Sequence, residues 1–270
     1  MNPVLNNQTF SNNNPGMHTQ QNQSFSQAQF GQMPLATPSA TSLDTGRMTY
    51  NDVIAKTAMS LGIVIVGALL GFVFPGIGMA GMFGGLVLGL YLSFSRKASA
   101  SLTMVYALCQ GLFAGGLSAM LEPAYPGVVS QALIGTISIF VATLVLYRSG
   151  KFRTNPKMNR IFTVGMWGMI IFGLINFVMM MTGLSGGTFG YYSTTIPGTS
   201  IPMGIFFGLA SIAMGAYSLV QDFEIVDYGV KTGAPKQMGW VSAFGITLTM
   251  VWMYTELLRL LSILQDSHNN

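Results

Sequence analysis

The chain has 270 residues, of which 50% are hydrophobic and only 7% are charged, against roughly 25% charged residues in an average soluble protein. This composition excludes an ordinary soluble globular fold. The net charge of +4 arises from so few charged residues that it gives no support to a nucleic-acid partner.

The first 46 residues form a tract rich in Asn, Gln, Ser and Pro, without an apolar run long enough to be buried. We expect this tract to be a disordered leader on the cytoplasmic side. It lacks the charged start, apolar core and small-residue cleavage site of a signal peptide. The leader is either inert or a binding segment for a partner, and the sequence leaves both readings open.

Seven apolar stretches follow the leader, and each is near the roughly 20 residues that a membrane-spanning helix requires. They cover residues 54–74, 76–94, 102–121, 127–147, 162–183, 201–221 and 239–263. Pro75 and Gly76 mark the boundary of the first two, which therefore form a tight hairpin unless one is bent or re-entrant. We predict an all-α, polytopic integral membrane protein, with a seven-span domain at 47–264 and a short polar tail at 265–270.

Basic residues indicate the orientation, because lysine and arginine accumulate in cytoplasmic loops and adjoining helix ends. Eleven of the twelve basic residues fall at the start of the first span or in alternate loops, and the opposite loops contain none. These eleven are Arg47, Lys56, Arg96, Lys97, Arg148, Lys151, Arg153, Lys157, Arg160, Lys231 and Lys236. The N-terminus is therefore predicted inside and the C-terminus outside. The uncharged segment 183–202, rich in Gly, Ser, Thr and Tyr, is predicted to be an extramembrane loop.

Glycines recur at four-residue spacing in several spans, and such spacing brings helix backbones close together. The sets are Gly67 with Gly71; Gly81 with Gly85 and Gly89; Gly111 with Gly115; and Gly204 with Gly208. They either pack a compact bundle or, in one case, form a dimer face.

Groups suited to enzymatic chemistry are scarce. Cys109 is the single cysteine, so an internal disulfide is excluded, and both histidines, His18 and His268, lie in polar end segments. These residues cannot build a buried zinc site or a Ser-His-Asp relay. We therefore expect neither an enzyme nor a bound cofactor.

Ionisable residues within the spans are the strongest indicators of function, because a charged side chain at the centre of a bilayer costs about 2.5–3.5 kcal/mol on insertion scales. Asp222 ends the sixth span and Glu256 lies within the seventh, and both are candidate proton-sensing and gating residues. The secondary candidates are Glu224, Asp227, Arg259 and Gln110. Asn176 in the fifth span, like Gln110 in the third, is expected to hydrogen-bond from helix to helix.

Two interpretations of Asp222 and Glu256 are open. Carboxylates that meet inside a bundle share protons, and such a pair would sense pH. Alternatively, Glu256 pairs with Arg259 on its own helix face, and Asp222 is an ordinary solvated helix end. A turn at Pro235 leaves the two acids about 12 Å out of register if both helices are straight. Their pairing therefore requires an irregular connection over residues 231–240.

Three sequence blocks resemble the Bax inhibitor-1-like family, especially its bacterial branch. They are YALCQGLFAGGLS in the third span, DFEIVDYGVKTGAPK after the sixth and VWMYTELLRLLS in the seventh. The resemblance covers residues 48–264 and leaves the leader outside. It implies a bundle of six helices around a central seventh, with two acidic residues forming a proton-sensitive latch. By motif these acids fall on Asp222 and on Glu256, within the run Tyr254-Thr255-Glu256-Leu257.

The chain departs from the family pattern at two of these positions. Glu256 stands where the family usually has aspartate, which is one methylene shorter. Gln110 stands where the family has glutamate, so an ion ligand or salt-bridge partner is missing there.

The leading hypothesis is a pH-sensitive cation leak channel of the bacterial cytoplasmic membrane, gated by a latch of Asp222 and Glu256. Calcium is the ion that the resemblance implies, and hard cations prefer the oxygen ligands that this bundle supplies. The alternative is a non-conducting membrane regulator that binds other membrane proteins. A proton-coupled transporter comes third, because no repeated discontinuous helix pair is evident. The expected partners are membrane lipid, calcium ion and membrane proteins, and no metal ligands are assigned.

Overall fold

The computed structural model describes residues 46–269 except 96–98, 184–188, 197 and 199–201. Seven long helices make up most of this part of the chain, and each is long and apolar enough to cross a membrane. They are α2 (Tyr50–Val73), α3 (Ile77–Phe94), α4 (Ala100–Leu121), α5 (Val128–Arg148), α6 (Pro156–Met181), α7 (Met203–Lys231) and α8 (Gly239–Asn269). Two short 3-10 helices, η1 (Gly190–Ser193) and η2 (Lys236–Met238), lie in the connections. The predicted all-α polytopic fold is confirmed, whereas the predictions for residues 1–45 and for Arg96 and Lys97 lie outside the described residues.

Several helices extend beyond their apolar runs. α6 begins at Pro156 instead of residue 162, because the Asn155 side chain accepts hydrogen bonds from the first backbone N–H groups of the helix. Proline suits this first position, since it has no N–H that needs a partner. α7 continues to Lys231, ten residues beyond its predicted end, and α8 continues through the predicted polar tail to Asn269.

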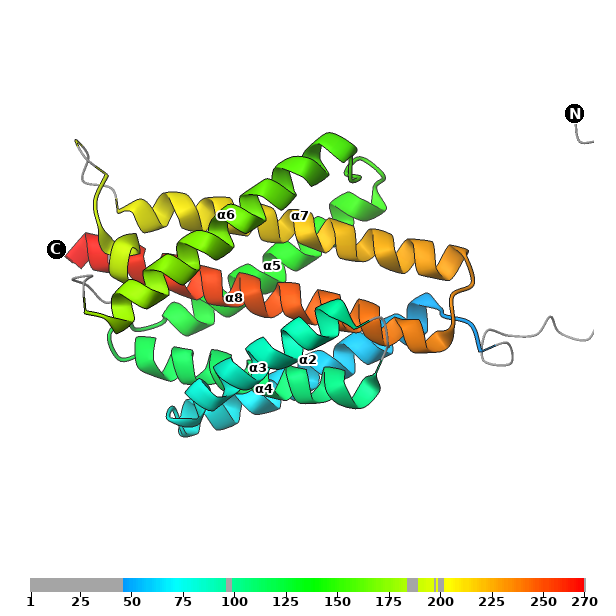
Figure 1. Cartoon of the computed structure of the whole chain (residues 1–270), viewed down its shortest axis with the longest axis horizontal. Helices are drawn as coiled ribbons and strands as arrows, with labels where there is room; N and C mark the ends of the chain where they lie inside the picture. The colour runs from blue at the N-terminus through cyan, green and yellow to red at the C-terminus, as the bar shows by residue number, and fades with distance from the viewer. Residues whose placement is uncertain (1–45, 96–98, 184–188, 197, 199–201, 270) are drawn as a thin grey trace, which may run out of the picture. The chain divides into compact units, whose positions relative to one another are not determined.

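α8 is the central helix of the bundle (Figure 1). It packs against α2, α4, α5 and α7. Within its apolar segment 56% of the residues are buried, against 6% for α6 at the periphery. The arrangement confirms the expected central seventh span and places the side chains of α8 between several neighbours at once.

Helices α2 and α3 follow one another through a short turn, but both pack chiefly against α4. Glycines permit this close approach. A Cβ atom added at Gly67 would lie 2.7 Å from the Leu108 carbonyl oxygen, and one added at Gly81 would lie 2.6 Å from the Cys109 carbonyl oxygen. The interpretation that these glycines pack the bundle is therefore confirmed.

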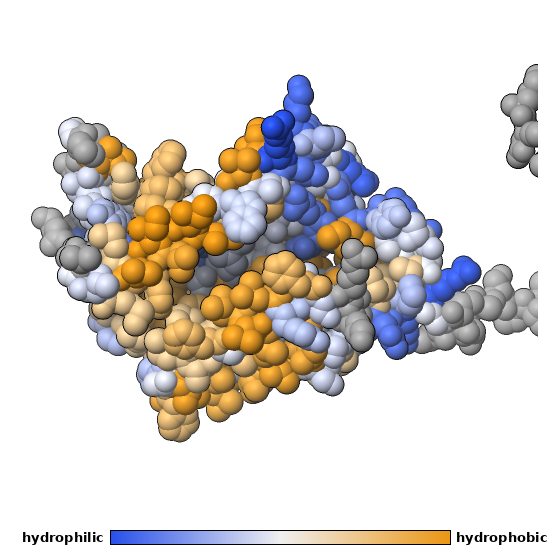
Figure 2. All heavy atoms as spheres, viewed as in Figure 1, coloured by the Kyte–Doolittle hydropathy of each residue, from blue (hydrophilic) through white to orange (hydrophobic). Residues whose placement is uncertain are grey.

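The surface of the bundle is largely apolar. Large hydrophobic side chains are exposed along α2, α3, α5 and α6. Figure 2 shows wide hydrophobic areas over the middle of the molecule and hydrophilic residues gathered at its right-hand end, where α5 joins α6 and α7 joins α8. This is the surface expected of helices that are surrounded by lipid.

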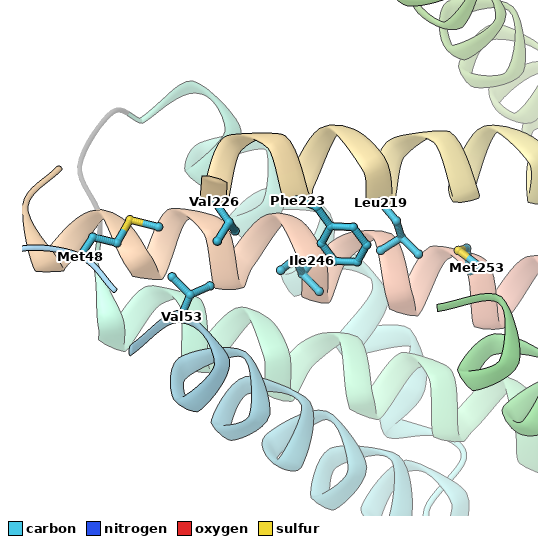
Figure 3. Packing of buried hydrophobic residues seen from close by; sticks show 7 residues of the cluster. All are labelled: Met48, Val53, Leu219, Phe223, Val226, Ile246 and Met253. Atoms are coloured by element: carbon cyan, nitrogen blue, oxygen red, sulfur yellow. The ribbon is translucent and has the colours of Figure 1, made fainter. Parts of the chain in front are cut away.

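The largest apolar core cluster lies along the interface of α7 and α8. Figure 3 shows it extending from the connection of the two helices toward the middle of the bundle. Its buried members are Met48, Val53, Leu219, Phe223, Val226, Ile246 and Met253. Because Met48 and Val53 belong to it, the start of α2 is anchored to the α7–α8 pair.

Candidate functional site

Glycines of α7 determine how α7 and α8 are aligned. A Cβ atom at Gly208 would lie 2.9 Å from the Leu260 side chain, and one at Gly215 would lie 2.6 Å from that of Met253. Seven residues along α7 are thus matched by seven residues back along α8. Neither glycine position has room for a side chain, so this alignment decides which polar residues meet.

Asp222 lies further along the same interface, beside Gly245 and Thr249 of α8. The Thr249 hydroxyl donates a hydrogen bond of 2.8 Å to the Asp222 carboxylate and also hydrogen-bonds to the Ser218 hydroxyl at 3.3 Å. A Cβ atom at Gly245 would lie 2.8 Å from Asp222 Oδ1. Asp222 takes part in no ion pair within the part of the chain that the structure describes. This half-buried carboxylate is therefore held by a neutral donor.

Glu256 forms an ion pair with Arg259, one turn further along α8. The two side chains are 13% and 21% exposed, respectively, and the side chains of Ser211 and Trp252 also hydrogen-bond to the carboxylate. The Arg259 guanidinium lies 3.9 Å from the ring centre of Tyr192 in η1. Burial raises the pKa of the Tyr192 hydroxyl, so the ring beneath the guanidinium stays uncharged. The predicted local pair of Glu256 and Arg259 is confirmed.

The predicted contact between Asp222 and Glu256 is not formed. Glu256 contacts Ser211, which precedes Asp222 by eleven residues on α7, and this spacing corresponds to about 16 Å along the helix axis. The irregular connection that the pairing requires is present as η2. However, α8 begins at Gly239 in an alignment set by the α7 glycines, so the connection does not bring the acids together. The two carboxylates are therefore not directly paired in this structure, and the latch stays a prediction.

The two remaining acids of α7 hold other parts of the chain. Glu224 accepts hydrogen bonds from the Thr154 backbone N–H at 2.8 Å and from the Thr154 hydroxyl. Asp227 accepts a hydrogen bond of 2.6 Å from the Tyr50 hydroxyl and lies 3.7 Å from the Arg153 guanidinium. These contacts fasten the α5–α6 connection and the start of α2 to the end of α7, which is a structural role.

Gln110 and Asn176 lie away from the two carboxylates. Gln110 of α4 hydrogen-bonds to Tyr106 and faces α3, where a Cβ atom at Gly85 would lie 2.7 Å from its side-chain nitrogen. The Asn176 side chain accepts a hydrogen bond from the Tyr191 backbone N–H at 2.8 Å. Asn176 therefore joins α6 to η1, and the predicted helix-to-helix bond is replaced by a helix-to-connection bond.

The sequence analysis missed a segment that we call the N-terminal strap, residues 46–49. The Met48 backbone N–H donates a hydrogen bond to the Ala234 carbonyl, and the Lys236 N–H donates one to the Gly46 carbonyl, both at 2.8 Å. These bonds tie the chain before α2 to the α7–α8 connection. Two short backbone bonds carry no pattern of residue types, so no sequence signal indicated them.

A buried lysine reinforces the N-terminal strap. The Lys56 ammonium donates hydrogen bonds of 2.6 Å to the Asp52 carboxylate and to the Lys236 carbonyl oxygen, and it lies 5.4 Å from the ring centre of Trp240. The i, i+4 spacing of Asp52 and Lys56 was the available signal for the first of these contacts. The strap, the α5–α6 connection and the α7–α8 connection are predicted to lie on the same side of the membrane. The structure brings these three segments together.

The described residues contain no group of three or more His, Cys, Asp or Glu side chains that could hold a metal ion.

The whole chain, including the N-terminal tract, is similar to one family. The model of the family described as Bax inhibitor 1 like matches residues 2–266. The match begins at residue 2, so the expectation that the leader lies outside the resemblance is corrected. Comparison with individual curated proteins gives no significant match.

Proposed function

The chain belongs to the Bax inhibitor 1 like family, and from this membership we propose that it forms a pH-sensitive cation leak pathway in the bacterial cytoplasmic membrane. In this proposal the N-terminus is inside, as the distribution of basic residues indicates. Calcium is the proposed ion, because hard cations are bound by carboxylate, hydroxyl and carbonyl oxygens. The seven apolar helices support a multi-pass membrane protein.

The proposal depends on one observation, the position of Asp222. Its carboxylate lies between α7 and α8, and its partner there is the neutral Thr249 hydroxyl. An ionised carboxylate at this place loses hydration without gaining a cationic partner, which costs free energy. A protonated carboxyl group carries no charge and avoids this cost. Gain or loss of a proton therefore changes how strongly α7 and α8 hold together, and a passing cation would compensate the ionised form.

Glu256 has a different part in this proposal. Its charge is already compensated by Arg259. It contacts Ser211 of α7, which lies about 16 Å from Asp222 along the axis of that helix. Asp222 is therefore the proposed proton-sensing residue. The Glu256–Arg259 pair is a separate polar point on the same helix interface.

Flux into liposomes tests the proposal. Purified protein is reconstituted with a calcium-sensitive dye inside, and calcium influx is measured at pH 6 and pH 8. We expect influx that depends on pH in wild-type liposomes and is lost from protein-free ones. Asp222→Asn should remove the pH dependence, whereas the matched change Asp227→Asn at the end of the same helix should retain it. Equal influx with and without protein at both pH values would contradict the proposal.

A non-conducting regulator is the second candidate, and the packing of α6 favours it. Asn176 is the only residue of α6 that is buried, so most of this helix is available to other membrane proteins. To test this, cysteine is introduced at Leu174, which is 63% exposed, in a Cys109→Ala background. Specific cross-linking from this position in native membranes, combined with silent liposomes, would favour the regulator.

A further inference from the structure

The polar side chains along the α7–α8 interface form two separate clusters. The Asp222 cluster consists of Asp222, Ser218 and Thr249, which are joined by hydrogen bonds. The Glu256 cluster consists of Glu256, Ser211 and Arg259. An ion that follows this interface has oxygen ligands at both clusters, so the side chains between them decide whether it passes.

Apolar side chains occupy the interval between the clusters. On α7, Gly215 lies between Ser211 and Ser218. On α8, Met253 lies between Thr249 and Glu256. Met253 fills the space that Gly215 leaves, since a Cβ atom at residue 215 would lie 2.6 Å from Met253 Cγ.

The packing in this interval is tight. Met253 is 1% exposed, and Leu219, which follows Ser218 of the Asp222 cluster on α7, is 0% exposed; both belong to the core cluster between the two helices. Figure 3 shows them as neighbours at the end of that cluster. A hydrated cation finds neither a ligand nor room for water between these side chains, and an apolar constriction of this kind blocks conduction by excluding water.

We propose that Met253, seated against Gly215 and backed by Leu219, is the apolar plug that separates the Asp222 cluster from the Glu256 cluster and closes the pathway. This inference rests on the proposed function, because it specifies how that pathway is kept shut. Methionine suits the position, since its unbranched side chain adopts another rotamer more easily than leucine or isoleucine. Because residue 215 has no side chain, a change of the Met253 rotamer meets no side chain at that position of α7.

Substitutions at Met253 test the plug through calcium influx into liposomes at pH 6 and pH 8, compared at the pH that gives the lower wild-type influx. Met253→Gln keeps the length of the side chain and adds a polar amide, and we expect it to raise influx at least about tenfold by admitting water. Met253→Leu keeps the interval apolar and should stay near the wild-type rate. Met120→Gln makes the same chemical change at an exposed position and should also stay near that rate. If the Gln variant does not elute as a monodisperse species, Met253→Ala takes its place. It leaves a gap beside Gly215, and we expect it to raise calcium influx above the wild-type rate.

Four results separate the plug from the proposed function. Leakage through Met253→Gln but not Met253→Leu supports the plug, even if the wild type is silent at both pH values; in that case only the pH-sensitive leak is overturned. Wild-type influx that differs between pH 6 and pH 8, combined with tight Gln and Ala variants at the pH of lower wild-type influx, overturns the plug alone. Equal leakage through the Gln and Leu variants overturns it as well. Silence of every protein at both pH values overturns both proposals.

Discussion

Asp222 and Gly245 face each other so closely that one Cβ atom on residue 245 would lie 2.8 Å from Asp222 Oδ1. Ordinary contacts of a Cβ atom are 3.4–4 Å long. The position of the carboxylate therefore depends on the absence of a side chain from this turn of α8. Glycine here provides the space in which Asp222 reaches Thr249.

Gly245→Ala is expected to displace the Asp222 carboxylate from Thr249. We expect a loss of roughly 1–3 kcal/mol in the free energy of unfolding, the range for overpacked sites, and a shifted pH dependence of calcium influx. Gly62→Ala is the matched control, because nothing lies within 4 Å of a Cβ atom there. It should be neutral or stabilise the helix by about 0.5–1 kcal/mol. Equal behaviour of the two variants in thermal unfolding and in flux would refute the assignment.

Asp222→Asn is expected to flatten the dependence of calcium influx on pH between about pH 6 and pH 8, because it removes the carboxyl group that gains and loses the proton in the proposed function. The amide keeps the size of the side chain and still accepts a hydrogen bond from Thr249, so thermal stability in detergent should change little. The measurement is influx against pH, with Glu256→Gln as the comparison, since Glu256 is compensated by Arg259. An unaltered profile for Asp222→Asn means that the proton-sensing group lies elsewhere.

Glu256→Gln is expected to lower the free energy of unfolding by roughly 1–3 kcal/mol, because it leaves the charge of Arg259 without its carboxylate. Arg259 Nε already lacks a hydrogen-bond partner among the described residues. No second acceptor therefore compensates the guanidinium when the carboxylate is removed. The double variant Glu256→Gln with Arg259→Gln should recover part of the loss. Thermal unfolding of the two single variants and the double variant measures the coupling. Additive losses would show that the pair contributes nothing to stability.

Two truncations distinguish the leader from the N-terminal strap. Removal of residues 2–45 should leave insertion and the monodisperse species unchanged, because the strap begins at Gly46. Removal of residues 2–49 also removes Met48, which is 3% exposed, and both strap hydrogen bonds. We expect it to cost about 2–4 kcal/mol. The comparison uses melting temperatures of the two proteins in one detergent, and identical values would argue against an anchoring role for the strap.

Cysteine labelling tests the orientation. Ser149→Cys in the α5–α6 connection and Thr195→Cys in the segment after η1 are made in a Cys109→Ala background, and both positions are exposed. A membrane-impermeant thiol reagent added to intact cells should label the cysteine at 195 and spare the one at 149. The reverse pattern would place the N-terminus outside.

Apolar run length and turn residues were sufficient to predict the number and order of the helices. The start of α6 and the end of α7 were harder to predict, because both helices extend beyond their apolar runs into polar sequence. α6 starts where Asn155 caps it, six residues before the apolar run begins. α7 continues because Glu224 and Asp227 find partners on other elements.

The candidate residues of the site were found from the sequence, whereas of their contacts only the Glu256–Arg259 pair was predicted. Asp222 and Glu256 stand out as acids in apolar spans, and Arg259 stands out by its spacing. Which of them meet depends on the alignment of two helices, and that alignment is decided by side-chain volumes at places such as Gly215 and Met253. A shift of one turn would have given each acid different neighbours.

The N-terminal strap and Lys56 also impose an order on biosynthesis. The acceptor of the Lys56 ammonium on Lys236 is 180 residues later in the chain. At roughly 5–20 residues per second, the ribosome needs about 10–40 s to reach it after Lys56 has been made. During that time the first span carries a lysine whose one partner, among the contacts described, is Asp52 on the same helix. The first helix that the structure describes is thus among the last to be fully fastened, because its lysine receives its second oxygen ligand only when the α7–α8 connection has been made.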